Sequence, residues 1–142
     1  MNLEDKLRHL EISEEMESRV RALPFREYDG PPRKNMKVRV YEEIIELSKL
    51  VGVDRPFVPA DNWIDFLKDC YKLRNFKDNF SVQSYKNLLL DPSKNELPNL
   101  APPAVFLYNG NYYIDGEGKH RLTIGKCIEA THAKVVVVEA LQ

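Results

Sequence analysis

Hydrophobic and polar residues recur with two different periods along this chain, and the period changes near residue 95. Before residue 95, apolar residues recur every three or four positions, which is the period of a helix that buries one face. After residue 95, short apolar runs separated by turn residues predict β-strands. The pattern therefore predicts an α+β fold, with a helical N-terminal region over residues 1–95. A small mixed β-sheet with one helix is expected over residues 96–142, packed with that region as one compact unit.

The N-terminal region is predicted to be helical, with an apolar stripe over residues 3–12 followed by four helices. The helices cover residues 13–23, 38–50, 61–71 and 84–90. The expected N-caps are Ser13 and Asp61, and Gly52 is expected to end the helix over residues 38–50. Trp63 and Phe66 are expected in the core, because helical spacing is what a core helix requires. The remaining polar segment, which carries Asp-Gly-Pro-Pro, is expected to be a loop.

The C-terminal region carries strand and turn signals in a definite order. Residues 104–108 and 112–114 are apolar runs joined by Asn-Gly-Asn at residues 109–111, and Asn-Gly between apolar runs is the strongest short hairpin signal. A helix is expected from His120, because the apolar residues that follow it are spaced to bury one face. Residues 134–138 are a β-branched run, which predicts a strand buried on both faces.

The loop between the second of these strands and the helix has the composition of a phosphate site. Gly116 and Gly118 let the backbone approach a ligand closely and adopt a positive φ. A helix start presents unpaired N–H groups and the positive end of the helix dipole. Lys119, His120 and Arg121 add cationic donors at the same place. These features predict a site for a phosphate-sized anion; the alternative is a strand-to-helix turn whose basic residues lie in water.

Each polar residue of this loop has an alternative role. Arg121 can hold a phosphate through two hydrogen bonds, or it can pair with a nearby carboxylate. His120 can donate to a phosphate or act as an acid or base near neutral pH, or it can cap the helix or bond within the core. Asp115 is the candidate Mg²⁺ ligand and Glu117 is grouped with the nucleotide-binding residues, although both carboxylates could equally serve the turn.

The order of elements and the glycine motif resemble the ParB/sulfiredoxin-like superfamily over residues 102–138. In that family a Pro-Pro-hydrophobic strand, a hairpin, a strand, an Asp-Gly box ending in His-Arg, a helix and a strand recur in this order. The box looks like residues 116–121 here, with one residue more between the first glycine and the histidine. The resemblance implies a small mixed sheet of the ParB/sulfiredoxin type and a nucleotide, ATP or CTP, held through its phosphates with Mg²⁺.

Two departures from the family pattern narrow what the resemblance implies. Sulfiredoxins carry a catalytic cysteine directly before the histidine of the box, whereas Lys119 stands there in this chain, so sulfinic-acid reduction is not expected. Cys127 follows on the expected core face and is interpreted as a small buried hydrophobe. Partition ParB proteins add a second, arginine-rich box and a DNA-reading helix-turn-helix, which we do not expect because the sequence ends at Gln142.

Composition and charge bound the class of partner. A net charge of −1 argues against a general polyanion-binding surface, and the basic run over residues 33–39 keeps a local DNA contact open. No apolar run approaches the ~20 residues needed to span a bilayer. The acidic start of the chain does not resemble a signal peptide, and two cysteines offer no disulfide framework. The expected location is therefore the cytoplasm, with no membrane partner.

Three functions are consistent with the sequence. The leading expectation is nucleotide binding by residues 115–121, with phosphoryl hydrolysis or transfer as a further activity, in a DNA-maintenance, plasmid or phage context that the resemblance implies. The first alternative is a DNA-binding protein with or without nuclease activity, which a basic surface would favour. The second alternative is an interaction or regulatory protein that retains the fold without ligand chemistry. The sequence leaves open whether the protein is an enzyme.

Overall fold

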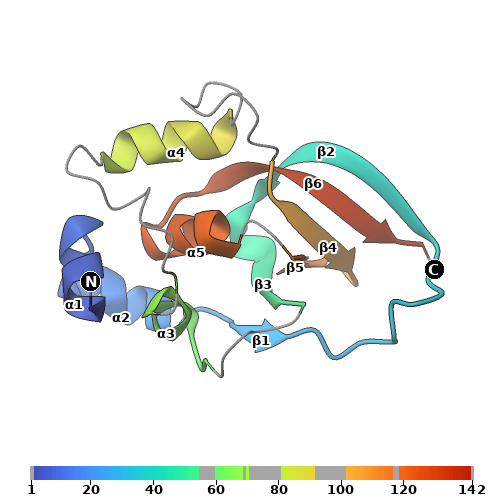
Figure 1. The fold of residues 1–142 in the computed structure, drawn as a ribbon, viewed down its shortest axis with the longest axis horizontal. Coiled ribbons are helices and arrows are strands. Elements are labelled where there is room, and N and C mark those ends of the chain that lie inside the picture. The colour runs from blue at the N-terminus through green and yellow to red at the C-terminus, as the bar shows by residue number, and fades with distance from the viewer. Residues whose placement is uncertain are drawn as a thin grey trace.

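The computed structural model describes residues 2–54, 60–68, 70, 81–91, 102–116 and 119–141. In this part of the chain, the protein is a mixed α/β molecule with five α-helices and one six-stranded sheet (Figure 1). The helices are α1 (Leu3–His9), α2 (Glu14–Arg21), α3 (Trp63–Lys68), α4 (Val82–Leu90) and α5 (Lys119–Cys127). The strands are β1 (Arg26–Glu27), β2 (Val38–Glu46), β3 (Leu50–Val53), β4 (Ala104–Tyr108), β5 (Asn111–Ile114) and β6 (His132–Ala140).

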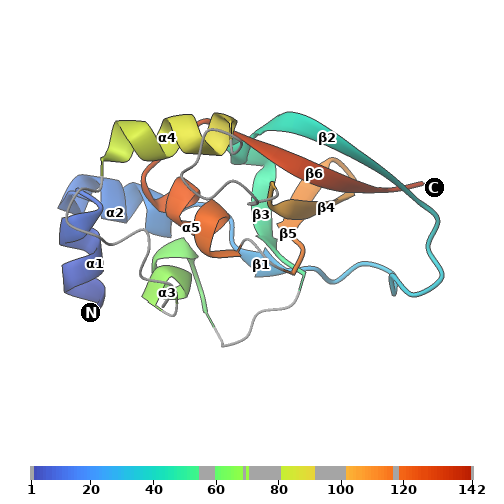
Figure 2. The same cartoon turned by 45° about the horizontal axis from the view of Figure 1, so that its top comes forward.

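The sheet has the order β1-β3-β5-β4-β6-β2 and takes strands from both sides of residue 95. Strands β1, β3 and β5 run parallel to one another, and β4 is antiparallel to β5 and parallel to β6. Strand β2 pairs with β6 in antiparallel register over nine residues and forms an edge of the sheet. Figure 2 shows the helices gathered at one side, with α4 and α5 nearest the sheet and α1, α2 and α3 beyond α5.

The prediction for the C-terminal region is confirmed from the hairpin to the last strand. Asn109 and Gly110 have φ values of 50° and 79°, which is the left-handed pair that a tight hairpin turn requires. Helix α5 starts at Lys119, one residue before the expected start. Residues 104–116 thus form strand, turn and strand, with Gly116 at φ 64° where a glycine conformation was expected.

The prediction of a helix over residues 38–50 is wrong. Residues 38–46 form β2, a short 3₁₀ turn η1 (Leu47–Lys49) follows, and β3 begins at Leu50. The apolar residues of this segment match both the helical period and the alternation of a strand. The segment forms a strand because it pairs with β6 over nine residues. Gly52 lies inside β3 instead of ending a helix, because a Cβ there would lie 1.6 Å from the backbone oxygen of Arg26 on β1.

The other N-terminal helices are present with small changes at their ends. Ser13 caps α2 as expected, since its side chain accepts a hydrogen bond from the Met16 N–H. Helix α3 is capped by Asn62 and not by Asp61, because the Asn62 side chain accepts from the Asp65 N–H at 2.9 Å. The expected extension of this helix includes residues 69 and 71, which lie outside the described residues.

The core lies between one face of the sheet and the helices. Trp63, Leu122 and Ile124 of the helices are fully buried in the same core cluster as Val135 and Val137 of β6. Each such aliphatic side chain contributes on the order of 1.5–3 kcal/mol by leaving water. The expectation that β6 is buried on both faces is wrong, because alternate residues of β6 on the second face remain partly exposed. The described helices cover only one face of the sheet, so the other face is left for loops and solvent.

Among the helices that the structure describes, none is long and apolar enough to cross a membrane.

Candidate functional site

Two aspartates lie side by side where the parallel strands β3 and β5 end. Asp54 directly follows β3, and its N–H donates to the Ile114 carbonyl at 2.8 Å. Asp115 directly follows β5, and its N–H donates to the Ala104 carbonyl at 3.0 Å. Ligands of open α/β sheets bind outside the carboxyl ends of parallel strands, so this edge is the first place to look for a site.

Arg33 joins the two aspartates from a segment far away in the sequence. Its Nη1 donates to Asp54 Oδ2 at 2.8 Å and to Asp115 Oδ1 at 3.1 Å, while Nη2 donates to Asp115 Oδ2 at 3.2 Å. The guanidinium also stacks on the Phe106 ring, 4.0 Å from its centroid. Burial opposes the charge of Arg33, but the bonds and charges of Asp115 and Asp54 outweigh it and raise the Arg33 pKa. Arg33 therefore stays a cation in a fixed position.

An aromatic cluster holds the segment that carries Arg33 on the second face of the sheet. The Tyr28 ring meets the rings of Phe106, Tyr108 and Tyr113 edge-on, with centroids 5.2, 5.6 and 5.4 Å away. The Tyr28 N–H donates to the Val53 carbonyl at 2.9 Å, which extends the pairing of β1 with β3. Burial raises the pKa of the Tyr28 hydroxyl. Residues 28–36 thus form a structured cover over β4 and β5 instead of a free loop.

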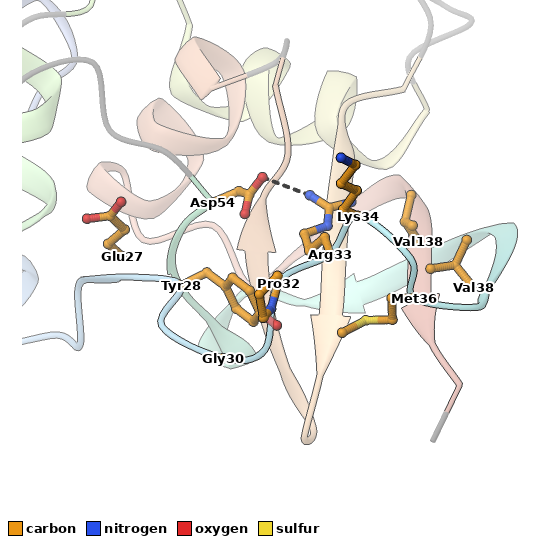
Figure 3. Close-up of a pocket in the computed structure, with 10 residues that line it drawn as sticks. All are labelled: Glu27, Tyr28, Gly30, Pro32, Arg33, Lys34, Met36, Val38, Asp54 and Val138. Carbon is orange, nitrogen blue, oxygen red and sulfur yellow. Dashed lines mark hydrogen bonds and ion pairs between the residues drawn. The ribbon is translucent and has the colours of Figure 1, made fainter.

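A hollow of about 720 Å³ lies between this cover and the sheet. Figure 3 shows Tyr28 and Arg33 of the cover on one side of the hollow, with Val38 of β2 and Val138 of β6 on the other. Asp54 lies at the end where Arg33 binds it (Figure 3). The volume falls in the range of small-molecule sites, and the lining combines apolar side chains with a few charged groups.

The glycine loop adjoins this arrangement through Asp115. Gly116 is exposed, has φ 64°, and would place a Cβ in open space with no atom within 4 Å. Helix α5 begins three residues later at Lys119, so its N-terminus is close to Gly116 along the chain. Glu117 and Gly118, two of the predicted binding residues, lie outside the described residues. The structure therefore brings Asp115, Gly116 and the start of α5 together at the carboxyl edge.

The predicted basic residues differ in their burial. Lys119 and Arg121 are half-buried, whereas His120 is 5% exposed and belongs to the core side of α5. Burial raises the pKa of the Tyr85 hydroxyl on α4, and the charge of Arg121 opposes that rise. Arg121 therefore lies near α4.

Asp115, the predicted Mg²⁺ ligand, is paired with Arg33 in this structure. Within the described ranges, no three His, Cys, Asp or Glu side chains are grouped so that they could hold a metal ion. A Mg²⁺ ion here would depend on one or two carboxylates and the phosphates of a nucleotide, which is its usual coordination in nucleotide sites.

Cys127 is fully buried in α5, and burial raises its pKa, so the interpretation as a core residue is confirmed.

Arg33 and Asp54 are the residues that the sequence analysis missed. In the sequence, Arg33 belongs to the basic run that keeps a DNA contact open, and Asp54 follows the segment over residues 38–50 that was predicted to be a helix. A strand prediction for residues 50–53 would have revealed the signal, because Asp54 and Asp115 would then both follow apolar strands. The pairing of those strands in parallel places both carboxylates at one edge.

Comparison of the chain with models of known protein families, with curated proteins and with solved structures found no match.

Proposed function

We propose that this protein binds a nucleoside triphosphate at the carboxyl edge of β3 and β5, on a sheet of the ParB/sulfiredoxin type. The observation that carries the proposal is the open backbone at Gly116, which has a positive φ between strand β5 and helix α5. A phosphate at this position would lie at the N-terminus of α5, where the positive end of the helix dipole favours an anion. Lys119 adds a cation in the same turn.

The charges around the loop are compatible with an anion because Arg33 offsets one of the two carboxylate charges and α5 adds cations. Asp54 and Asp115 would repel a phosphate if they stood alone, but both are bonded to the Arg33 guanidinium. Lys119 and Arg121 contribute two further positive charges on α5. With Mg²⁺ present, Asp115 would be the carboxylate that exchanges Arg33 for the metal of a Mg²⁺–nucleotide complex.

The hollow beneath the cover is the proposed place for the nucleoside. Arg33 and Asp54 line the hollow, and Arg33 also binds Asp115, so the hollow and the glycine loop share a boundary. Apolar side chains such as Met36 and Val138 suit the faces of a base. Hydrolysis or transfer of a phosphoryl group would be a further step, whose readout is turnover of the bound nucleotide.

DNA binding receives less support as the alternative. Within the basic run over residues 33–39, Arg33 is bonded to two aspartates and Arg39 to Glu139 at 2.7 Å. Lys34 and Lys37 remain as the exposed cations of the run. Affinity for DNA grows with the number of phosphates that a protein neutralises. Two lysines beside a carboxylate-rich edge would therefore bind the DNA backbone only weakly.

The first test is a thermal-shift screen with matched glycine variants. ATP, CTP, GTP, ADP, inorganic tripolyphosphate and a short DNA duplex are compared, each with and without Mg²⁺. A ligand at ~100 times its Kd stabilises a protein by about 2.7 kcal/mol, which a melting curve resolves. Gly116→Ala should abolish the shift. Gly110→Ala is the control, because Gly110 has the same open surroundings and a positive φ at the opposite end of β5.

The two glycine variants should lose similar stability without ligand, ~1–2 kcal/mol, because alanine is strained at a positive φ. Equal responses of both variants to nucleotide would remove the glycine loop from the site. If nucleotides raise the melting temperature no more than tripolyphosphate does, the phosphate site is supported and the hollow is rejected as the nucleoside pocket. A shift with DNA alone would favour the DNA-binding alternative, and the absence of any shift would favour a protein partner.

Arg121→Ala is predicted to abolish nucleotide binding if the arginine contacts phosphate. The measurement is the thermal shift of this variant with the nucleotide that stabilises the native protein most. Because Arg121 lies near Tyr85, the competing expectation is a structural role. In that case the variant would melt at a lower temperature and still respond fully to the nucleotide, which would restrict the phosphate site to Gly116 and the first turn of α5.

A further inference from the structure

Strand β2 leaves a long, regular edge open on the described part of the sheet. It pairs with β6 through nine consecutive residues without a bulge, and the strand order ends at β2 (Figures 1 and 2). Natural edge strands are usually protected by prolines, charged side chains (lysine above all), bulges or a short length. Strand β2 has four charged residues, Arg39, Glu42, Glu43 and Glu46, but it is long and contains neither proline nor lysine. Its outer N–H and C=O groups can therefore pair with another strand.

One face of β2 exposes three large apolar side chains, interspersed with Glu42 and Glu46. Val38, Val40 and Ile44 are 41%, 60% and 53% exposed and alternate along the strand, so they lie on the face away from the helices. The opposite face carries Arg39 and Glu43, which are both exposed. Arg39 is bonded on one side to Glu139 of β6, and the guanidinium has further donors that can reach outward.

The sequence of β2 is complementary to itself about a single residue. Two copies of an edge strand can pair in antiparallel fashion around a two-fold axis. The same sheet face then points the same way in both copies only if one residue lies directly opposite its own copy at the axis. With Tyr41 at the axis, Arg39 of each copy faces Glu43 of the other, Val38 faces Ile44, and Val40 faces Glu42. With Glu42 or Glu43 at the axis, two identical carboxylates would face each other, which is unfavourable.

We propose that β2 pairs with β2 of a second copy of this chain, in antiparallel register centred on Tyr41. The pairing joins two six-stranded sheets into one continuous sheet across the dimer. It places two Arg39–Glu43 ion pairs on the helix side, and two Val38–Ile44 and two Val40–Glu42 pairs on the other side. The charge complementarity of Arg39 and Glu43 is therefore what selects a second copy of this chain as the occupant of the edge. The carboxyl edge with Gly116 stays outside the interface.

The test uses two charge-reversal variants that should be unable to self-associate and able to associate with each other. Arg39→Glu would face Glu43 in its own dimer, and Glu43→Arg would face Arg39 in its own dimer. In a mixed dimer of the two variants, both crossing pairs have opposite charges. Sedimentation velocity over ~1–500 µM should find the native chain dimeric, each variant monomeric, and the equimolar mixture dimeric. Glu46→Arg is the matched control, because it makes the same charge change outside residues 38–44 and should stay dimeric.

Several outcomes would overturn the proposal. A native chain that stays monomeric at 500 µM excludes the dimer. Variants that dimerise singly, or a mixture that stays monomeric, exclude this register. Arg39→Glu also faces Glu139 within its own chain, so melting curves establish that each variant is folded. If Arg39→Glu does not fold, Glu43→Arg and Glu46→Arg are compared instead. A dimeric Glu43→Arg variant contradicts the proposed contact. Monomers of both variants contradict it as well.

Discussion

Lys126 is buried in the middle of the fold with a positive charge and no acidic partner among the described side chains. It is 4% exposed, and its Nζ donates to the Leu47 carbonyl at 2.7 Å. The ammonium lies 5.4 Å from the centroid of the Trp63 ring. Burial lowers the pKa of Lys126 from 10.5 to about 8. The side chain therefore carries its charge at neutral pH at a cost to stability.

The prediction for Lys126 concerns stability as a function of pH. The pKa is lower in the folded protein, so the unfolded chain binds the proton more tightly and native stability rises between about pH 8 and pH 10.5. Below pH 8 the cost of the buried charge is constant, on the order of 3 kcal/mol. The lost hydrogen bond to the Leu47 carbonyl offsets part of this cost. Lys126→Met should therefore stabilise the protein by ~1–2 kcal/mol at pH 7, with a gain that shrinks as pH rises through that interval.

Urea unfolding of both proteins from pH 6 to pH 10 measures this difference. Lys134→Met, on the open face of β6, controls for the loss of one positive charge from the molecule. A Lys126→Met protein that is less stable at pH 7, or whose gain does not change with pH, would mean that the Leu47 hydrogen bond outweighs the cost of burial.

At the scale of elements, local signals decided the helix ends and the hairpin. The Asn109-Gly110 turn and the Ser13 cap depend on conformations that these residues adopt from their own chemistry, so both could be predicted. Strand β2 could not, because its apolar residues fit two periods and the choice depends on β6, about 90 residues away. The N-cap of α3 was misplaced by one residue because Asp61 and Asn62 are both good caps.

Helix α3 depends on a lysine from another helix. Lys6 of α1 is 3% exposed, and its Nζ donates to the carbonyls of Leu67 and Lys68 at 3.2 and 2.7 Å. These are the last carbonyls of α3, where the helix dipole favours a cation. A helix of six residues has little stability of its own, so this contact from α1 matters for it.

Lys6→Met is predicted to destabilise the protein by ~1–2 kcal/mol, because the Lys68 carbonyl would lose its buried donor. The effect is opposite in sign to that of Lys126→Met, since Lys6 interacts with a helix end and Lys126 does not. The midpoint of urea unfolding measures it, and hydrogen exchange of the α3 amides locates it. Lys49→Met, at an exposed position, is the control. Unchanged exchange in α3 would show that the lysine does not support the helix.

At the scale of the whole molecule, Arg33 connects the cover to the sheet. The arginine bonds residues 21 and 82 positions away in the sequence and stacks on β4. The rings around Tyr28 add a second attachment on the same face. The sheet therefore has helices on one face and an aromatic-lined cover on part of the other, and the hollow exists because the cover is held in place.

Arg33→Gln is predicted to loosen the cover and destabilise the protein by roughly 1–3 kcal/mol. Glutamine cannot balance two carboxylates, and the Arg33 side chain is only 26% exposed, so solvent compensates in part. Hydrogen exchange should accelerate at the Tyr28 N–H, which is bonded to β3. Arg8→Gln, which removes a largely exposed ion pair, is the control and should change little. Equal exchange rates in both variants would mean that the aromatic rings alone hold the cover.

The sequence by itself determined the C-terminal strand, hairpin, glycine turn and helix, because each depends on the backbone preferences of a few neighbouring residues. It also determined that the protein combines helices with a sheet. Only the tertiary structure decided that residues 38–46 are a strand, that β6 is open on one face, and that Arg33 joins Asp54 to Asp115. These features depend on contacts between segments that are distant in the sequence. A local pattern of residues cannot predict the energies of such contacts.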